Sequence, residues 1–243
     1  MSLFSIFRKK KEEPFPFHEL KVDMHSHLVP GIDDGAATEE DSFRLMEGLF
    51  ELGYEKLITS PHIMQDLYPN TPETINGGLA KLRKRYGPGK IQAAAEYFLD
   101  DHVARLLEFD SQLLTVKDNI VLIEFSFVSP PMGMRELIFQ LQMKGYQPIL
   151  AHPERYGYYH QDFSQYEELS RAGCYLQCNL LSFTGYYGDM VRRVAEQLAE
   201  RGMVDFLGTD LHHDRHLENL QAMTLTPALA QVLEKGVLNG SLI

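Results

Sequence analysis

Short apolar runs alternate with longer amphipathic segments along most of this chain of 243 residues. The segment from Thr38 to Gly53 is typical: a polar N-cap precedes acidic residues, apolar side chains repeat on one helical face, and a glycine closes the run. Similar signals predict helices over residues 71–87 and 131–145. Each of these helices precedes a short apolar run that predicts a β-strand.

The apolar runs define seven predicted strands, at residues 22–27, 56–62, 91–98, 120–127, 148–155, 175–182 and 204–213. Strands that alternate with helices predict an α/β fold with a parallel sheet covered by helices. Because the chain has no dinucleotide-binding fingerprint, we expect a closed or distorted TIM-like barrel rather than an open doubly wound sheet. The expected organisation is a flexible leader over residues 1–20 and a single domain over residues 21–243.

Acidic residues outnumber basic residues by 34 to 23, which gives a formal charge of −11. Such a surface repels a phosphodiester backbone and argues against a nucleic-acid partner, although bound metal ions could still attract a small phosphorylated substrate. Cys174 and Cys178 are expected to be buried, reduced thiols. No apolar run approaches the roughly 20 residues that span a bilayer. We therefore expect a cytoplasmic protein that is not transmembrane, whose apolar and basic leader offers at most a peripheral contact with a membrane or a partner.

Histidines and carboxylates stand at the carboxyl ends of six of the predicted strands: His25, His27, His62, Glu96, Glu124, His152, Asp210 and His212. In an α/β barrel these ends meet at one rim, where active sites are built. A single histidine there is more often a hydrogen-bonded rim residue, and a single glutamate a surface charge. Five imidazoles and three carboxylates together instead predict a multinuclear metal site, because carboxylates are costly to bury unless cations compensate them.

Six motifs at these positions, DMHSHLVPGIDDG, TSPH, EYF, EFS, LAHPER and GTDLHH, resemble those of the polymerase and histidinol phosphatase (PHP) superfamily. The similarity is greatest to its bacterial manganese-dependent tyrosine-protein phosphatases of the capsule and exopolysaccharide type. The resemblance implies a distorted (β/α)7 barrel with a centre of three divalent metal ions. It also implies hydrolysis of phosphotyrosine on a bacterial tyrosine kinase of polysaccharide export. Manganese is the implied metal, although mixed imidazole and carboxylate ligands also accept iron or zinc.

Carried over residue by residue, the resemblance assigns one ion to His25, His27, Glu96 and Asp210. Glu96 would bridge to a second ion, which Glu124 and His152 complete. A third ion would lie between His62, His212 and an aspartate of the DDG sequence. Asp34 is the expected aspartate, and Asp33 is its substitute.

Two further residues are candidates for work on the substrate. Arg155 lies three residues beyond His152, and its planar guanidinium suits phosphate oxygens, so we prefer phosphate binding to a surface salt bridge with Glu154. Asp33 or a rim histidine could assist the departure of the phenolate. Bound divalent ions would supply hydroxide near neutral pH.

Other functions fit the same residues. The chain could be another PHP-type phosphoesterase that acts on a small phosphate monoester such as histidinol phosphate, or a noncatalytic metal-stabilised adaptor. An amidohydrolase fits less well, because no lysine stands at a strand end to form a bridging carbamate. The PGIDDG and HPER sequences favour a protein-tyrosine phosphatase.

Overall fold

The computed structural model describes residues 13–243, so the first part of the expected leader lies outside the described residues. Nine short strands are β1 Val22–Asp23, β2 Lys56–Thr59, β3 His62–Ile63, β4 Ile91–Ala93, β5 Glu96–Phe98, β6 Ile120–Glu124, β7 Gln147–Ala151, β8 Tyr175–Asn179 and β9 Phe206–Gly208. Eight α-helices are α1 Glu39–Leu52, α2 Pro72–Tyr86, α3 Asp101–Glu108, α4 Met134–Met143, α5 Ser164–Arg171, α6 Asp189–Glu200, α7 Asp214–Gln221 and α8 Pro227–Lys235. Five short 3-10 turns are η1 Phe17–Glu19, η2 Pro153–Arg155, η3 Gly157–Tyr159, η4 Leu180–Thr184 and η5 Leu238–Leu242.

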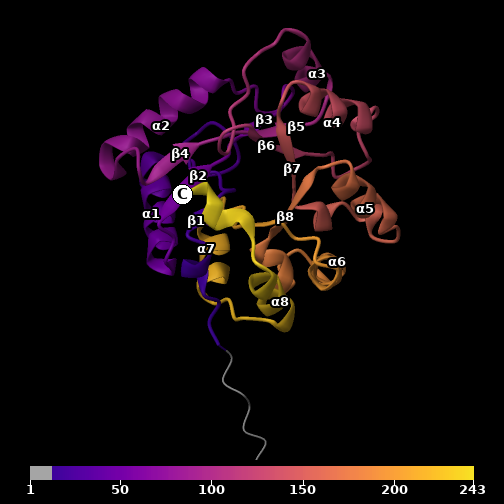
Figure 1. Cartoon of the computed structure of the whole chain (residues 1–243). Coiled ribbons are helices and arrows are strands. Elements are labelled where there is room, and N and C mark those ends of the chain that lie inside the picture. The colour runs from indigo at the N-terminus through magenta and orange to yellow at the C-terminus, as the bar shows by residue number, and fades with distance from the viewer. Residues whose placement is uncertain (1–12) are drawn as a thin grey trace, which may run out of the picture.

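Every ladder between the described strands is parallel, as the alternation of strands and helices predicts. The strands form a three-stranded sheet, β1-β2-β4, and a six-stranded sheet, β3-β5-β6-β7-β8-β9. The second and third predicted strands are each divided into two pieces, β2 with β3 and β4 with β5, so the succession passes from one sheet to the other. Figure 1 shows the strands in the middle of the molecule with the helices around their outside.

The segment that follows the last strand, β9, lies beside the segment that follows the first strand, β1. Beyond β9, the Leu211 carbonyl accepts a hydrogen bond of 2.9 Å from the His27 amide, and the Asp210 amide donates to the His25 carbonyl at 2.8 Å. Asp23 accepts hydrogen bonds from both the amide and the hydroxyl of Thr209, each at 3.1 Å. The fold is therefore α/β with parallel strands in the distorted barrel order that the sequence predicts.

Local signals explain where the helices begin and end. Thr38 and Asp41 form a capping box at the start of α1, and Gly53 closes the helix with φ of 112°, a left-handed conformation that suits glycine. The helix predicted from residue 131 begins at Met134, because Gly133 with φ of 68° precedes it. The connection before β6 contains α3, a helix that the apolar pattern does not predict.

The apolar side chains divide into two clusters. The larger cluster lies between the strands and the helices, and includes Val121 and Ile123 of β6. The smaller cluster takes Leu122 of the same strand together with residues from β1, β2, β7 and β9. Neighbouring residues of a strand point to opposite faces, so the smaller cluster is the interior packing of the barrel.

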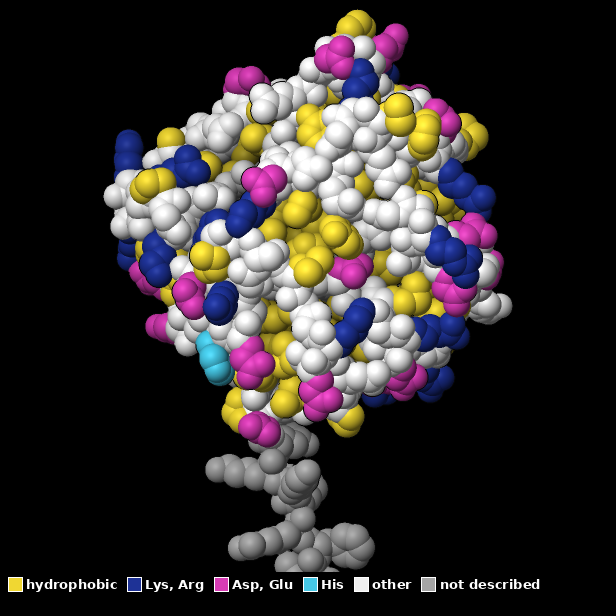
Figure 2. All heavy atoms as spheres, viewed as in Figure 1, with side chains coloured by type: hydrophobic (Ala, Val, Ile, Leu, Met, Phe, Trp, Pro, Cys, Tyr) yellow, Lys and Arg dark blue, Asp and Glu magenta, His cyan; other side chains and the backbone are white. Residues whose placement is uncertain are grey.

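The two ends of the described chain are tied to this framework. Phe15 and Phe17 are buried, and the Phe15 amide donates to the Met223 carbonyl at 3.1 Å, so this part of the expected leader packs against the rest of the described chain. At the other end, Asn239 bonds to the Val22 carbonyl at 3.0 Å and to the Leu207 backbone, which joins β1 to β9. On the face seen in Figure 1 and Figure 2, hydrophobic side chains gather near the middle and charged side chains lie around them.

No helix within residues 13–243 combines the length and the apolar character that crossing a bilayer requires. Cys174 and Cys178 are buried free thiols, as predicted.

Candidate metal centre

The nine predicted metal ligands converge at the carboxyl ends of the strands. Each belongs to at least one group whose ligand atoms lie within 4.8 Å of one another: His27 with Asp34, His62 and His212; His25 with His27 and Asp210; His25 with Glu96 and His152; and His62 with Glu96 and Glu124. These groups share members, so the four form one continuous cluster. Residues separated by up to 187 positions in the sequence are therefore brought together by the parallel strands.

Glu96, at the start of β5, is the centre of the cluster and is fully buried. Its Oε2 atom lies 3.2 Å from His25 Nε2, 3.4 Å from His27 Nε2 and 3.2 Å from His62 Nδ1. Its Oε1 atom lies 3.0 Å from His152 Nε2. A carboxylate with both oxygens facing imidazole nitrogens is suited to bridge two cations.

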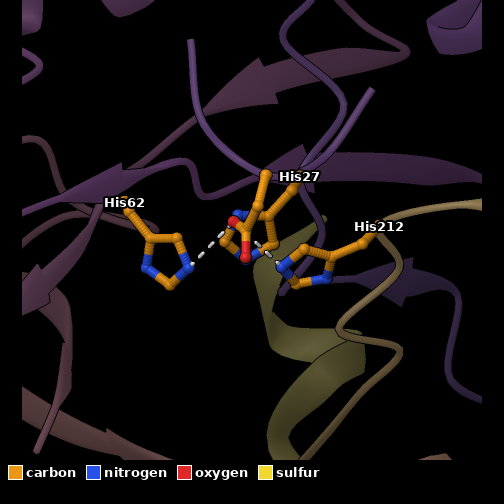
Figure 3. A group of neighbouring side chains, drawn as sticks. His27, His62 and His212 are labelled. Carbon is orange, nitrogen blue, oxygen red and sulfur yellow. Dashed lines mark ion pairs between the residues drawn. The ribbon is translucent and has the colours of Figure 1, made fainter. Parts of the chain in front are cut away.

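Asp34 joins the imidazoles on the open side of the cluster. Its Oδ1 atom lies 3.4 Å from His62 Nε2 and 3.6 Å from His212 Nε2. Figure 3 shows His62 and His212 on opposite sides of His27, both directed toward the carboxylate between them. The rings of His27 and His212 are stacked at 3.9 Å.

Hydrogen bonds on the far side of three rings fix which nitrogen faces the cluster. His25 Nδ1 donates to Gln177 Oε1 at 2.6 Å, His27 Nδ1 donates to Asp33 Oδ2 at 2.8 Å, and His212 Nδ1 donates to the Asp210 carbonyl at 2.8 Å. Because each Nδ1 donates on the far side, each Nε2 faces the cluster and can present a lone pair there once the imidazole is neutral. This is the arrangement by which proteins orient histidine ligands toward a metal ion.

Several buried atoms of the cluster have no hydrogen-bond partner in the described chain. They include His62 Nδ1 and Glu124 Oε1, which face each other at 2.8 Å, and His152 Nδ1. Buried polar atoms are normally satisfied, and an ion is one explanation for those that are not. The donor types, the lone-pair directions and these orphan atoms all fit bound divalent cations.

The cluster also carries unbalanced charge unless cations are present. Burial alone would lower the pKa of His25, but Glu96 and Asp210 raise it to about 9. The pKa values of His27 and His62 are also raised despite burial. Although burial would raise them, the pKa values of Glu96 and Asp210 lie well below the ordinary range because imidazoles surround them. The metal-free centre therefore holds protons that a divalent cation would displace.

Two ligands occupy strained backbone. His152 has φ of 35° and Asp210 has φ of 51°, both in the left-handed region that side chains other than glycine rarely adopt. His152 is the first residue after β7 and Asp210 the second after β9, so the unusual turn at each strand end directs the side chain toward the cluster. Strain of this kind persists at functional sites because the surrounding structure enforces it.

Asp33 and Asp34 have different surroundings. Asp33 is held behind His27, where Oδ2 also accepts from the His62 amide at 3.1 Å and Oδ1 accepts from the Gly35 amide at 3.0 Å. Gly35 is needed for this packing, since a Cβ there would lie 2.2 Å from the His27 carbonyl oxygen. Asp33 is absent from the described residues that line the cavity, whereas Asp34 lines it. Asp33 therefore lies behind His27, where its Oδ2 atom orients the imidazole, and its predicted role as an acid stays a prediction.

Arg155 lies at the edge of the same cavity, which has a volume of about 240 Å³. Its Nη1 donates to Asp210 Oδ2 at 3.0 Å, and its guanidinium lies 4.7 Å from the Phe127 ring centre and 4.4 Å from that of Tyr187. The side chain is 25% exposed, so its remaining N–H groups can reach a ligand in the cavity. This position suits the predicted contact with phosphate.

The sequence analysis missed several residues that complete the site. Gln177 orients His25, and Asn179 Nδ2 donates to Asp210 Oδ2 at 2.7 Å. Their spacing of two residues in a predicted strand could have placed both side chains on the face of the site. Phe127 also lines the cavity, and its loop position carries no comparable signal. Tyr187, His213 and His216 line it too: the sequence leaves open whether Tyr187 flanks an aromatic substrate ring or caps the core, and it places the two histidines at the rim or on the surface.

Comparisons with known proteins add independent information. A family model described as "Capsular polysaccharide synthesis, CpsB/CapC" matches residues 21–229. The tyrosine-protein phosphatase YwqE of Bacillus subtilis is 29% identical over 196 residues, which are 79% of this chain and 77% of that protein. The tyrosine-protein phosphatase CpsB of Streptococcus agalactiae serotype V is 27% identical over 203 residues, which are 79% of this chain and 83% of that protein.

A solved structure supports the same relationship. It comes from a study of YwqE from Bacillus subtilis and CpsB from Streptococcus pneumoniae, described as unique metal-dependent tyrosine phosphatases. The two structures superimpose with a TM-score of 0.71 at 26% identity, covering 88% of this chain and 85% of the other.

Proposed function

Because the chain belongs to the CpsB/CapC family of capsular polysaccharide synthesis, we propose that it is a metal-dependent protein-tyrosine phosphatase that hydrolyses phosphotyrosine. The observation that carries the proposal is the convergence of nine imidazole and carboxylate side chains in one cluster, six of which line a small cavity together with the partly exposed guanidinium of Arg155. Related proteins named as tyrosine phosphatases support the same reaction.

The proposed centre holds three divalent ions, preferably manganese. One ion would be held by His25, His27, Glu96 and Asp210, a second by Glu96, Glu124 and His152, and a third by Asp34, His62 and His212. Charge supports this number: four ligand carboxylates and a phosphate dianion carry roughly six negative charges, which three divalent ions balance. Iron or zinc would satisfy the same donors.

Each part of the centre has a separate task in this reaction. Bound divalent ions lower the pKa of water toward neutrality and compensate the charge on the phosphate oxygens. Arg155 holds the phosphoryl group through its free N–H groups and keeps its charge at any pH that the protein meets. Asn179 fixes Asp210 from behind, and Gln177 and Asp33 hold their imidazoles in the required tautomer. The leaving phenolate has a pKa of about 10, so it needs little help from an acid.

The proposed substrate is a phosphotyrosine protein, and a bacterial tyrosine kinase of polysaccharide export is the partner that the family's role in capsule synthesis suggests. Such a kinase would be met in the cytoplasm. The net charge of −11 disfavours nucleic acid as a substrate.

The test begins with a phosphotyrosine peptide and purified protein that a chelator has stripped of metal. Activity should be absent, return when manganese is added, and accompany about three ions per chain in elemental analysis. His152→Ala and Asp210→Ala should each lower turnover more than about a hundredfold and leave a folded chain. Full activity of the stripped protein would refute the proposal. Turnover of histidinol phosphate but not of the peptide would favour a small-molecule phosphatase, and metal binding without turnover of either would favour an adaptor.

A further inference from the structure

Phe127 lines the cavity but has no role in the proposed reaction. The Phe127 ring is stacked on His152, with ring centres 5.4 Å apart, and carries the Arg155 guanidinium at 4.7 Å. Phe127 is nevertheless 49% exposed. Part of the ring therefore supports the site, and about half of the side chain stays exposed in a residue that lines the cavity.

Apolar surface continues along the chain from this ring. The segment of residues 126–133, called the recognition loop below, also carries Val128 at 89% and Met132 at 96% exposure. The loop is fixed at its start, because Tyr158 donates a hydrogen bond of 2.9 Å to the Ser126 carbonyl. Phe127 lines the metal-site cavity, Val128 follows it directly in the chain, and Met132 lines a second cavity to which Ser126 also belongs. Exposed large apolar side chains beside a polar cavity are typical of a surface that binds a ligand.

The geometry points to the recognition loop as the surface that receives the phosphotyrosine segment of the substrate, with Phe127 against the tyrosine ring and Val128 and Met132 against neighbouring apolar residues. This inference rests on the proposed phosphatase function and adds its substrate selectivity. A phosphoryl group on Arg155 has its ester oxygen close to the ring that supports the guanidinium. The aromatic ring of phosphotyrosine can therefore pack on Phe127, whereas the side chain of phosphoserine carries no ring to occupy that place.

The ring contact is tested by inhibition of peptide turnover with two phosphate-site ligands, inorganic phosphate and phenylphosphonate. Phe127→Leu should weaken inhibition by phenylphosphonate about fivefold and leave inhibition by inorganic phosphate unchanged, because only the first ligand has a ring. The kcat/KM for the phosphotyrosine peptide should fall by a similar factor. Phe139 on α4 is 54% exposed and does not line the cavity in the described chain, so Phe139→Leu is the matched control.

The apolar extension is tested by the double substitution Val128→Ser with Met132→Ser. It should reduce kcat/KM for the peptide several times more than for p-nitrophenyl phosphate, which has no flanking residues. An equal effect on both substrates would overturn the extended docking surface.

Phe127 could instead serve only to support His152. In that case Phe127→Leu would weaken both inhibitors equally and lower the metal content in elemental analysis, and this result would overturn the inference. A parent protein that fails to hydrolyse the phosphotyrosine peptide would refute the proposed function itself. An active parent whose two inhibition constants respond equally to the substitution would refute only the role of the loop.

Discussion

Replacing Arg155 with alanine separates phosphate binding from metal binding. The guanidinium contacts the metal centre only through Asp210, whose same oxygen also accepts a hydrogen bond of 2.7 Å from Asn179. Asp210 therefore keeps one of its two supports in the variant. We expect Arg155→Ala to retain its metal ions and to lose affinity for the phosphoryl group in the transition state.

The size of the loss follows from the geometry. One of the five N–H groups of Arg155 is bound to Asp210, and two of the remaining four can bind a phosphate dianion side by side. Charge-assisted hydrogen bonds contribute about 1.5–3 kcal/mol each. Because the side chain is 25% exposed and water competes for it, we take about 3 kcal/mol for the pair, which corresponds to roughly a hundredfold loss of kcat/KM. Arg155→Lys should recover only part of this loss, since lysine lacks the planar fork that packs between Phe127 and Tyr187.

The assay combines steady-state turnover of a phosphotyrosine peptide, elemental analysis and thermal unfolding on the same preparations. Arg135 on α4 has a side chain that is 71% exposed, so Arg135→Ala controls for the loss of a surface arginine. Activity of Arg155→Ala within about threefold of the parent would refute the assigned role. Loss of metal in proportion to the loss of activity would show that the residue supports the centre instead.

Four other predictions concern the acidic residues and the protons of the site. Asp34→Asn should lower the number of bound ions per chain in elemental analysis. Asp33→Asn should keep that number but weaken the affinity for metal about tenfold or more. The same number of bound ions in both variants would contradict the distinction between the two aspartates. Adding manganese to the metal-free protein at pH 7.5 should release protons, because the pKa of His25 is about 9, and calorimetry in buffers with different ionisation heats should detect them. In the metal-free protein, the stabilisation from protonated His25 should be complete below pH 6.5 and lost as the pH rises through about 9. Burial raises the pKa of Asp23 from 3.8 to about 6. As the pH rises between these values, the free energy of unfolding of the parent should therefore fall relative to that of Asp23→Asn. Urea unfolding measures both free energies, and a difference that does not change with pH would contradict this.

The sequence predicts most of the fold because its signals are local. The α1 helix begins at Thr38 and ends at Gly53 as expected, since the cap and the glycine act through backbone contacts of their own neighbours. The convergence of eight of the nine candidate ligands could be predicted because each of them stands at the end of a predicted strand, and parallel strands bring such ends to the same rim, whereas Asp34 comes from the family resemblance.

Other features depend on contacts between distant segments. The division of the strand at residues 91–98 into β4 and β5 follows from pairing with two different sheets, which no local pattern contains. Asp33 and Asp34 are adjacent and chemically identical, and only the packing of Gly35 against His27 determines which of them faces the cavity. Phenylalanine is a residue type that usually lies in the core, and the position of Phe127 beside Arg155 depends on the path of the loop.

The positive φ angles of His152 and Asp210 have a consequence for attempts to make the protein more robust. Glycine would fit both positions better, and each present side chain costs about 1–2 kcal/mol of backbone strain. A stabilisation strategy that selects residues by local conformational preference would therefore replace both and erase the centre. At these two positions the chain retains a less favourable backbone because the ligand must point inward, so catalytic competence and maximal folding stability select different amino acids.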